Sequence, residues 1–225
     1  MKKYKLAFTK LVAITLLLCS CNLGLKQELV EKIEKIIKPV VEKIESDKKE
    51  EELNTNHAET IFYLIKKNDE LCKDYRRQFY SSLEYNKIRI TNLIEIFYKT
   101  IIQNAELVTL IKSIIDRGSI FVQNPLEIAV LDIYKRKDDL IDFNSKEKLK
   151  GIKNKINKIL AMQQQWIKNI DKIIITYNDN ANLQNNIGGE LEAYLRTTYD
   201  NILKPDSSEI YDLMIEIGRD LQENL

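Results

Sequence analysis

Apolar residues recur along most of this chain at the spacing of α-helices. From about residue 58 onward, isoleucine, leucine and aromatic side chains stand three and four positions apart, with lysine, glutamate and asparagine between them. This is the pattern of helices that bury one face. Strand-like runs are short and lie inside longer helical periods, as at 173–175. The pattern therefore predicts an all-α fold, a single multi-helix bundle domain over residues 57–225.

Polar breaks and capping signals divide this domain into helices. Asn124 followed by Pro125 is a start signal, a cap and then a first-turn proline. Asn144 with Glu147 resembles a capping box that opens the longest helix, and Trp166 lies in the apolar line of that helix as an expected core anchor. A weakening is expected around Gly118. The expected helices cover about 61–79, 90–102, 107–115, 124–142, 145–178, 188–203 and 208–221.

The first 20 residues have a different pattern, that of a bacterial lipoprotein signal peptide. Four lysines precede an apolar run over 11–18, and the small residue Ser20 stands directly before Cys21. The run is shorter than the roughly 20 residues that span a bilayer, and its order is that of a cleaved secretory signal. Cys19 is the weaker candidate because bulky Leu18 precedes it. Lipidation is therefore expected at Cys21, where two or more acyl chains such as palmitate would anchor the mature protein to a membrane.

Between the signal and the bundle lies a predicted tether, residues 21–56. Residues 25–45 have the spacing of an amphipathic helix, which Pro39 is expected to kink or split. The charged run 46–56 is expected to be a flexible linker. The apolar face of the helix could pack on the domain, lie on the membrane or pair with a second copy, and the sequence leaves these three alternatives open.

The balance of charge gives no indication of a nucleic-acid partner. The chain carries 35 basic and 34 acidic residues, and loss of the signal removes only basic ones, so no nucleic-acid partner is expected.

With Cys21 acylated and Cys19 removed, Cys72 is the remaining cysteine, and no intramolecular disulfide can form. Cys72 follows the apolar pattern of a helix, which favours a buried thiol, with an intermolecular disulfide as the alternative.

The residue types that perform catalysis are not gathered in any familiar motif. His57 is the single histidine of the chain, so no zinc spacing or serine-histidine pairing can be built, and no metal or cofactor is expected. Gly188 and Gly189 lack the pattern of a phosphate-binding loop. Asp138 and Asp139 are expected to be surface charges. The chain is therefore not expected to be an enzyme.

A protein-binding role would need an exposed patch instead. Tyr134, Tyr199 and Tyr211 are the weak candidates for such a patch, because tyrosine is enriched at interfaces, although each also fits a buried helix face. Helix bundles also hold ligands in their cores, but the sequence identifies no missing core side chain.

Two segments resemble one family of proteins. The stretch RRQFYSSLEYNKIRITNLIEIF (76–97) contains a basic residue, a YSSL-Y core and a helix rich in lysine and isoleucine, and QQQWIKNIDKIIITYNDN (163–180) contains a W-I helix with a Tyr-Asn ending. Both are similar to the virulent-strain-associated surface lipoproteins of Lyme disease Borrelia, the family that includes the factor-H-binding complement-regulator-acquiring surface protein. The resemblance covers roughly residues 58–203. The core of the first motif consists here of Tyr80, Ser81, Ser82, Leu83 and Tyr85.

The resemblance implies an all-helical, lipid-anchored protein with a long central helix, exposed at the surface of the bacterial outer membrane. Members of that family differ in partners, among them complement regulators and components, plasminogen and tick proteins. The leading hypothesis is a surface protein that binds a host or tick protein, with a complement component as one candidate; the alternative is a structural, self-associating envelope lipoprotein. Because the terminal helix from Ser208 is short, a monomer or weak homodimer is expected.

Overall fold

The described part of the chain consists of helices joined by short turns, and it contains no β-strand. The computed structural model describes residues 2–47, 57–65, 69–143, 145–186, 189–204 and 207–222. This confirms the expected all-α fold. The α-helices are α1 (Lys2–Asp47), α2 (Ala58–Ile65), α3 (Asp69–Ser82), α4 (Lys87–Gln103), α5 (Val108–Asp116), α6 (Asn124–Lys135), α7 (Leu140–Phe143), α8 (Lys146–Asp179), α9 (Ala181–Asn185), α10 (Glu190–Thr198) and α11 (Ser207–Gln222). Tighter 3₁₀ turns form η1 (Ala105–Leu107) and η3 (Lys137–Asp139), and wider π turns form η2 (Arg117–Gln123) and η5 (Tyr199–Leu203).

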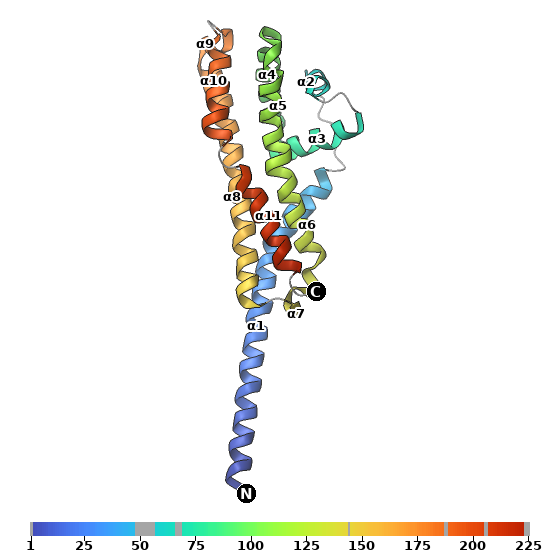
Figure 1. Ribbon diagram of the computed structural model, residues 1–225, viewed down its shortest axis with the longest axis vertical. Helices are drawn as coiled ribbons and strands as arrows, with labels where there is room; N and C mark the ends of the chain where they lie inside the picture. Colours follow the sequence, from blue (N-terminus) through green and yellow to red (C-terminus); the bar gives the residue numbers. More distant parts are fainter. Residues whose placement is uncertain are drawn as a thin grey trace.

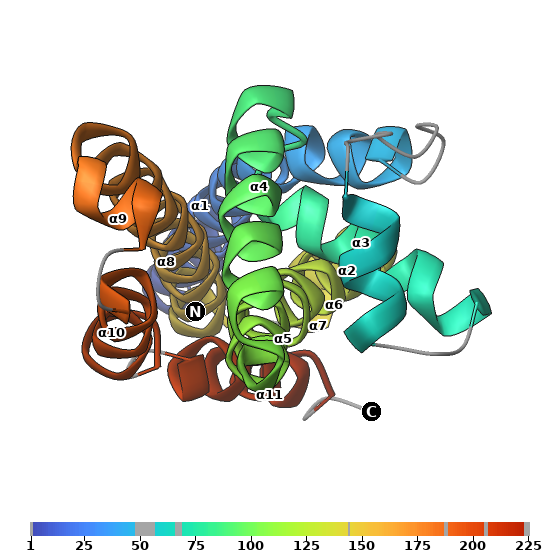
Figure 2. The ribbon, with the colours of Figure 1, turned by 90° about the horizontal axis from the view of Figure 1, so that it is seen from above.

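Three long helical columns form the body of the bundle (Figures 1 and 2). One is α8, the expected long central helix, another is the second half of α1, and the third runs from α5 through η2 into α6. Contacts join α1 to both α8 and α6, and α11 packs across α6 and α8. The remaining helices surround these columns, with α2 and α3 on one side and α9 and α10 on the other (Figure 2).

The long helix α8 has one buried face, and its apolar line is the one expected from the sequence. Ser145 caps its first turn, since the hydroxyl accepts a hydrogen bond from the backbone N–H of Lys148 (3.2 Å). The expected cap, Asn144, lies outside the described residues. Trp166 is 5% exposed, which confirms it as a core residue. The buried residues of α8 are Leu149, Ile152, Ile156, Ile159, Trp166, Ile167, Ile170, Ile173, Ile174 and Tyr177.

The apolar face of α1 packs on the bundle, which is one of the three arrangements that the sequence leaves open. Its buried residues are Val30, Ile33, Ile37, Val41 and Ile44, each 8% exposed or less. The folded unit therefore includes residues 30–47, which the sequence assigns to the tether. Pro39 does not split the helix, although the C-terminal end of α1 leans away from the axis of the rest (Figures 1 and 2), as expected of an interior proline.

Residues 58–82 form two helices where the spacing predicts one. The rings of Phe62 on α2 and of Tyr75 and Phe79 on α3 meet edge to face, with centroids 6.2 and 6.1 Å apart. Because the apolar faces of both helices meet the same core, their combined spacing resembles that of one continuous helix. Periodicity alone therefore does not distinguish two helices that pack on the same core from one long helix.

Asn124 is the first residue of α6, but it does not cap a free helix end as expected. The chain is already helical before it, with Asn124 at φ −59° and ψ −47°, and its N–H bonds to the carbonyl of Ser119, five residues earlier. The wider turn η2 leads into Pro125, which has no backbone N–H to donate to a helical hydrogen bond. The predicted weakening at Gly118 is thus a π turn inside a continuous helical column. This column ends at Lys135, whereas the sequence predicts a helix that continues to about residue 142. The elements η3 and α7 follow Lys135 instead.

The polar stretch 178–186 is not a complete break, because it contains the short helix α9. Asn180 caps this helix, since its side chain accepts hydrogen bonds from the N–H groups of Asn182 and Leu183. The helix expected over 188–203 consists of α10 followed by η5.

Candidate functional site

The predicted lipidation site is on α1, the helix whose N-terminal part extends beyond the bundle (Figure 1). Cys21 belongs to this helix, and its side chain lies outside the described part. Val30 is the first buried residue of the described α1 side chains, and nine helical residues span about 13 Å. An acyl group on Cys21 would therefore hold the end of the bundle near α7 close to a membrane. None of the described helices is apolar over a stretch long enough to cross a bilayer.

The opposite end of the bundle is formed by α9 and by the ends of α4 and α8 (Figure 1). It lies one length of α8 away from the base, and 34 helical residues span about 50 Å. Two isolated isoleucines stand out near this end, Ile102 at 63% exposed and Ile175 at 59%. Lys172, one turn before Ile175, is exposed, as are the amides and carboxylates within ten residues of these isoleucines along the chain, namely Gln103, Glu106, Asn178, Asp179, Asn182, Gln184 and Asn185.

The motif residues that carry the family resemblance join three helices in the core. Ser81 donates a hydrogen bond of 2.5 Å to the buried carboxylate of Asp47 at the end of α1. Ser82 accepts one of 3.2 Å from the indole N–H of Trp166 on α8. Tyr80 and Leu83 are buried beside them. The motif is therefore structural and ties α1, α3 and α8 together.

A second polar group links α3 to α6 inside the bundle. The guanidinium of Arg77 donates two hydrogen bonds of 2.9 Å to the carboxylate of Glu127, which is 6% exposed. Gln123 donates to the same carboxylate and accepts from Gln163 on α8. Burial lowers the pKa of Arg77, but the hydrogen bonds and charges of Glu127 and Asp74 raise it by more. This arginine therefore stays charged, and the group acts as a structural crosslink.

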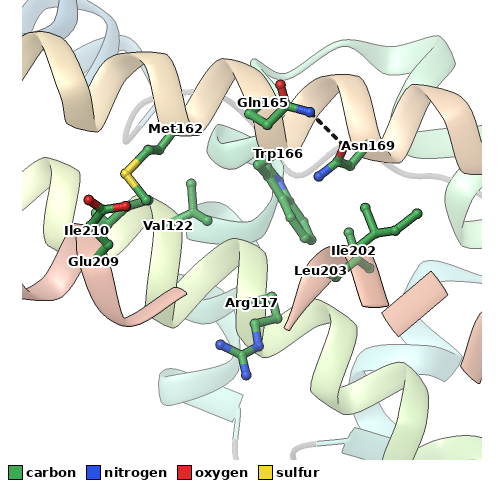
Figure 3. A pocket seen from close by; sticks show the side chains of 10 residues that line it. All are labelled: Arg117, Val122, Met162, Gln165, Trp166, Asn169, Ile202, Leu203, Glu209 and Ile210. Carbon is green, nitrogen blue, oxygen red and sulfur yellow. Dashed lines mark hydrogen bonds between the residues drawn. The ribbon is translucent and has the colours of Figure 1, made fainter. Parts of the chain in front are cut away.

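A cavity of about 210 Å³ lies between α8, η2, η5 and the start of α11 (Figure 3). Its apolar lining is contributed by all four elements. Trp166 and Met162 come from α8, where they stand one turn apart on the same face. The remaining apolar lining residues are Val122, Ile202, Leu203 and Ile210. The cavity is thus an apolar site built from segments more than 80 residues apart in sequence.

Charged and amide groups stand at the edges of this cavity. Arg117 has no ion pair with a carboxylate among the described residues; its guanidinium lies 4.7 Å from the ring centroid of Phe121 and 5.9 Å from that of Tyr199. Glu209, by contrast, is paired with Lys158. Across the cavity, the amides of Gln165 and Asn169 bond to each other at 2.9 Å (Figure 3). The uncompensated charge of the cavity is therefore positive and belongs to Arg117.

The three candidate tyrosines do not form one patch. Tyr134 lies on α6, half-buried, under the ammonium of Lys137 at 4.7 Å. Tyr199 is half-buried in η5 beside Arg117. Tyr211 on α11 is 51% exposed. None of the three lines the cavity, although Tyr199 contacts the lining residue Arg117.

Groups that could perform catalysis or bind a metal are not assembled in the described residues. His57 stacks on the ring of Tyr98, with centroids 3.5 Å apart, and lies 3.7 Å from a carboxylate oxygen of Glu95. Asp138 and Asp139 are exposed. The described part of the chain holds no group of three histidine, cysteine or acidic side chains that could bind a metal ion. Cys72 falls within α3, and its side chain lies outside the described part.

Sequence reasoning missed Arg117 and the cavity that it lines. The cavity exists because η5 and α11 stop short of filling the space over Trp166, and this depends on how the helices are placed. The one signal in the sequence is the Arg-Gly pair at 117–118, where the helical pattern weakens.

Taken together, the fold and its sites define an all-helical protein with an N-terminal helical extension, a partly open cavity beside Trp166 and no assembled catalytic group in its described part. Residues 64–219 match a family model described as Borrelia Bbcrasp-1 domain containing protein. The chain belongs to this family. No curated protein matches it significantly.

Solved structures of Borrelia surface proteins share the fold. The Borrelia spielmanii protein BSA64 superposes with a TM-score of 0.70 at 23% identity, over 89% of this chain and 97% of that one. The outer surface lipoprotein BBA64 of Borrelia burgdorferi gives 0.67 at 22%, over 90% and 96%. The Lyme disease associated outer surface protein BBA65 of the same species gives 0.71 at 24%, over 85% and 100%.

Proposed function

We propose that this protein is a non-enzymatic outer-surface lipoprotein, acylated at Cys21, that binds a host or tick protein. Membership in the Borrelia family supports it, as do the names of BBA64, an outer surface lipoprotein, and BBA65, an outer surface protein. The observation that carries the proposal is the course of α1. One continuous helix leads from the acylation site into the core, so a lipid at Cys21 fixes which end of the bundle faces the membrane.

The partner would then bind at the end formed by α9 and the ends of α4 and α8. This end is about 50 Å from the base and carries the exposed isoleucines Ile102 and Ile175 among polar groups. Small apolar centres with polar rims are common in protein interfaces. A complement component is the partner that the family resemblance favours.

The alternative, a self-associating envelope lipoprotein, rests on the apolar face of residues 25–45. Ile33, Ile37 and Ile44 of that face are at most 1% exposed within their own bundle. They are not free to pair with a second copy unless α1 leaves the bundle. This burial removes the support that the α1 face gave to self-association, and host binding is the function that we propose.

The experiment is a capture assay with the chain from residue 21 onward, immobilised through its N-terminus to reproduce the orientation on a cell. Human serum is passed over it, bound proteins are identified by mass spectrometry, and each is tested again in purified form. Ile175→Glu at the outer end should lower the affinity for the partner at least tenfold. Leu25→Glu, a matched change at an exposed position next to the anchor, should leave the affinity unchanged.

Two outcomes would contradict the proposal. One is that nothing binds beyond an unrelated helical control, from serum or from tick extract. The other is that Leu25→Glu lowers the affinity as much as Ile175→Glu, which would move the binding surface to the base of the bundle.

A further inference from the structure

We propose that the cavity between α8, η2, η5 and α11 binds the acyl chain of a medium-chain fatty acid, with the carboxylate held by Arg117. This would be a second, small-molecule function that does not depend on the protein partner proposed above. Three features of the cavity support it: its size, its apolar lining and the single uncompensated charge at its edge.

The size of the cavity favours one short hydrocarbon chain. An apolar cavity of about 150 Å³ is enough to take up benzene, and this one measures about 210 Å³. A chain of about eight carbons is of suitable size on the same scale. Met162 is an adaptable lining residue, because its thioether side chain changes rotamer readily.

The charge at the edge selects an anionic head group. Glu209 is neutralised by Lys158. The guanidinium of Arg117 lies over the rings of Phe121 and Tyr199 and pairs with no carboxylate of the described residues. Contacts with ring faces leave N–H donors of a guanidinium available, and these donors form strong paired hydrogen bonds with a carboxylate. Figure 3 shows the side chains of Arg117 and Glu209 apart from each other. A carboxylate bound at Arg117 thus has room away from the acidic group.

The lining itself supplies the readout, because Trp166 is the single tryptophan of the chain. The experiment titrates octanoate into the chain from residue 21 onward and follows the fluorescence of Trp166, with calorimetry as a second measurement. Parallel titrations use 1-octanol, which has the same chain without a charge, and octylammonium, which has the opposite charge. Octanoate should bind at least tenfold tighter than octanol, about the worth of one charge-assisted pair of hydrogen bonds, and octylammonium should not bind.

Two variants and one control locate the site. Arg117→Met should make the affinities for octanoate and octanol equal. Met162→Phe, which fills part of the cavity from a half-buried position, should weaken both ligands. Arg219→Met removes an exposed cation of α11 that does not line the cavity, and it should change neither affinity. Circular dichroism spectra establish that each variant keeps its fold.

Three results would overturn the proposal. Equal binding of octanoate and octanol by the unmodified chain would remove the role of Arg117. An unchanged octanoate affinity in Arg117→Met would place the carboxylate elsewhere. Tighter binding of a two-chain lipid, dioctanoyl phosphatidylglycerol, would assign the site to a membrane lipid rather than to a free fatty acid.

Discussion

Gly118 stands where the column of α5 and α6 presses most closely on its neighbours. A Cβ atom there would lie 2.7 Å from the hydroxyl of Ser82, 2.9 Å from the indole of Trp166 and 3.0 Å from the ring of Phe79. All three side chains are buried, and the Ser82 hydroxyl already accepts from Trp166 and donates to a backbone carbonyl. None of them can move without breaking other contacts. Gly118→Ala should therefore destabilise the protein.

The magnitude follows from two opposing effects. Alanine in a helix is favoured over glycine by about 0.5 to 1 kcal/mol, whereas overpacking a closed core costs about 1 to 3 kcal/mol. The crowding here involves three side chains, so we expect a net loss of about 2 kcal/mol. Urea unfolding followed by Trp166 fluorescence measures it, and the melting temperature should fall by about 4 to 8 °C.

Gly218→Ala is the matched control, because Gly218 also lies in a helix but a Cβ there meets nothing within 4 Å. It should be neutral or stabilising by up to about 1 kcal/mol. If Gly118→Ala proves as stable as Gly218→Ala, the close packing of η2 against α3 and α8 is wrong.

Three further perturbations test other contacts. Arg77→Met leaves the buried Glu127 without its cation and should lower the free energy of unfolding by about 3 kcal/mol, measured in urea; adding Glu127→Met should recover part of the loss. Lys155→Met removes the bridge to Asp220 on α11 (2.7 Å). Burial lowers the pKa of Lys155, but Asp220 and Glu216 raise it by more. The contribution of this bridge to the free energy of unfolding should therefore be complete below about pH 10.4, the unfolded pKa of lysine. It should disappear as the pH rises through the higher folded pKa. A chain that begins at residue 57 loses the buried face of α1 and should aggregate in size-exclusion chromatography, while one that begins at residue 21 should not.

The sequence predicts the fold well where one helix packs along its whole length. The apolar line of α8, with Trp166 in it, could be read directly because its period persists for 34 residues. Periodicity reports that a face is buried but not what covers it. For that reason the partner of the α1 face, which includes Ile37, could not be assigned.

Sequence reasoning failed where tertiary contacts decide the local structure. At Asn124 the capping signal is overridden, because η2 widens beside α3 and carries the helix through the proline. Arg117 could not be identified as a candidate binding residue for a similar reason. Its surroundings are created by η5 and α11, which come more than 80 residues later.

The central claim, that the bundle is displayed outside the cell on a lipid at Cys21, is tested most directly by adding protease to intact Borrelia cells that produce the chain. The account predicts that the bundle is digested while a periplasmic marker survives, and that Cys21→Ser abolishes both the incorporation of labelled palmitate and the retention of the chain on cells. A bundle that stays protected until the cells are lysed would contradict it.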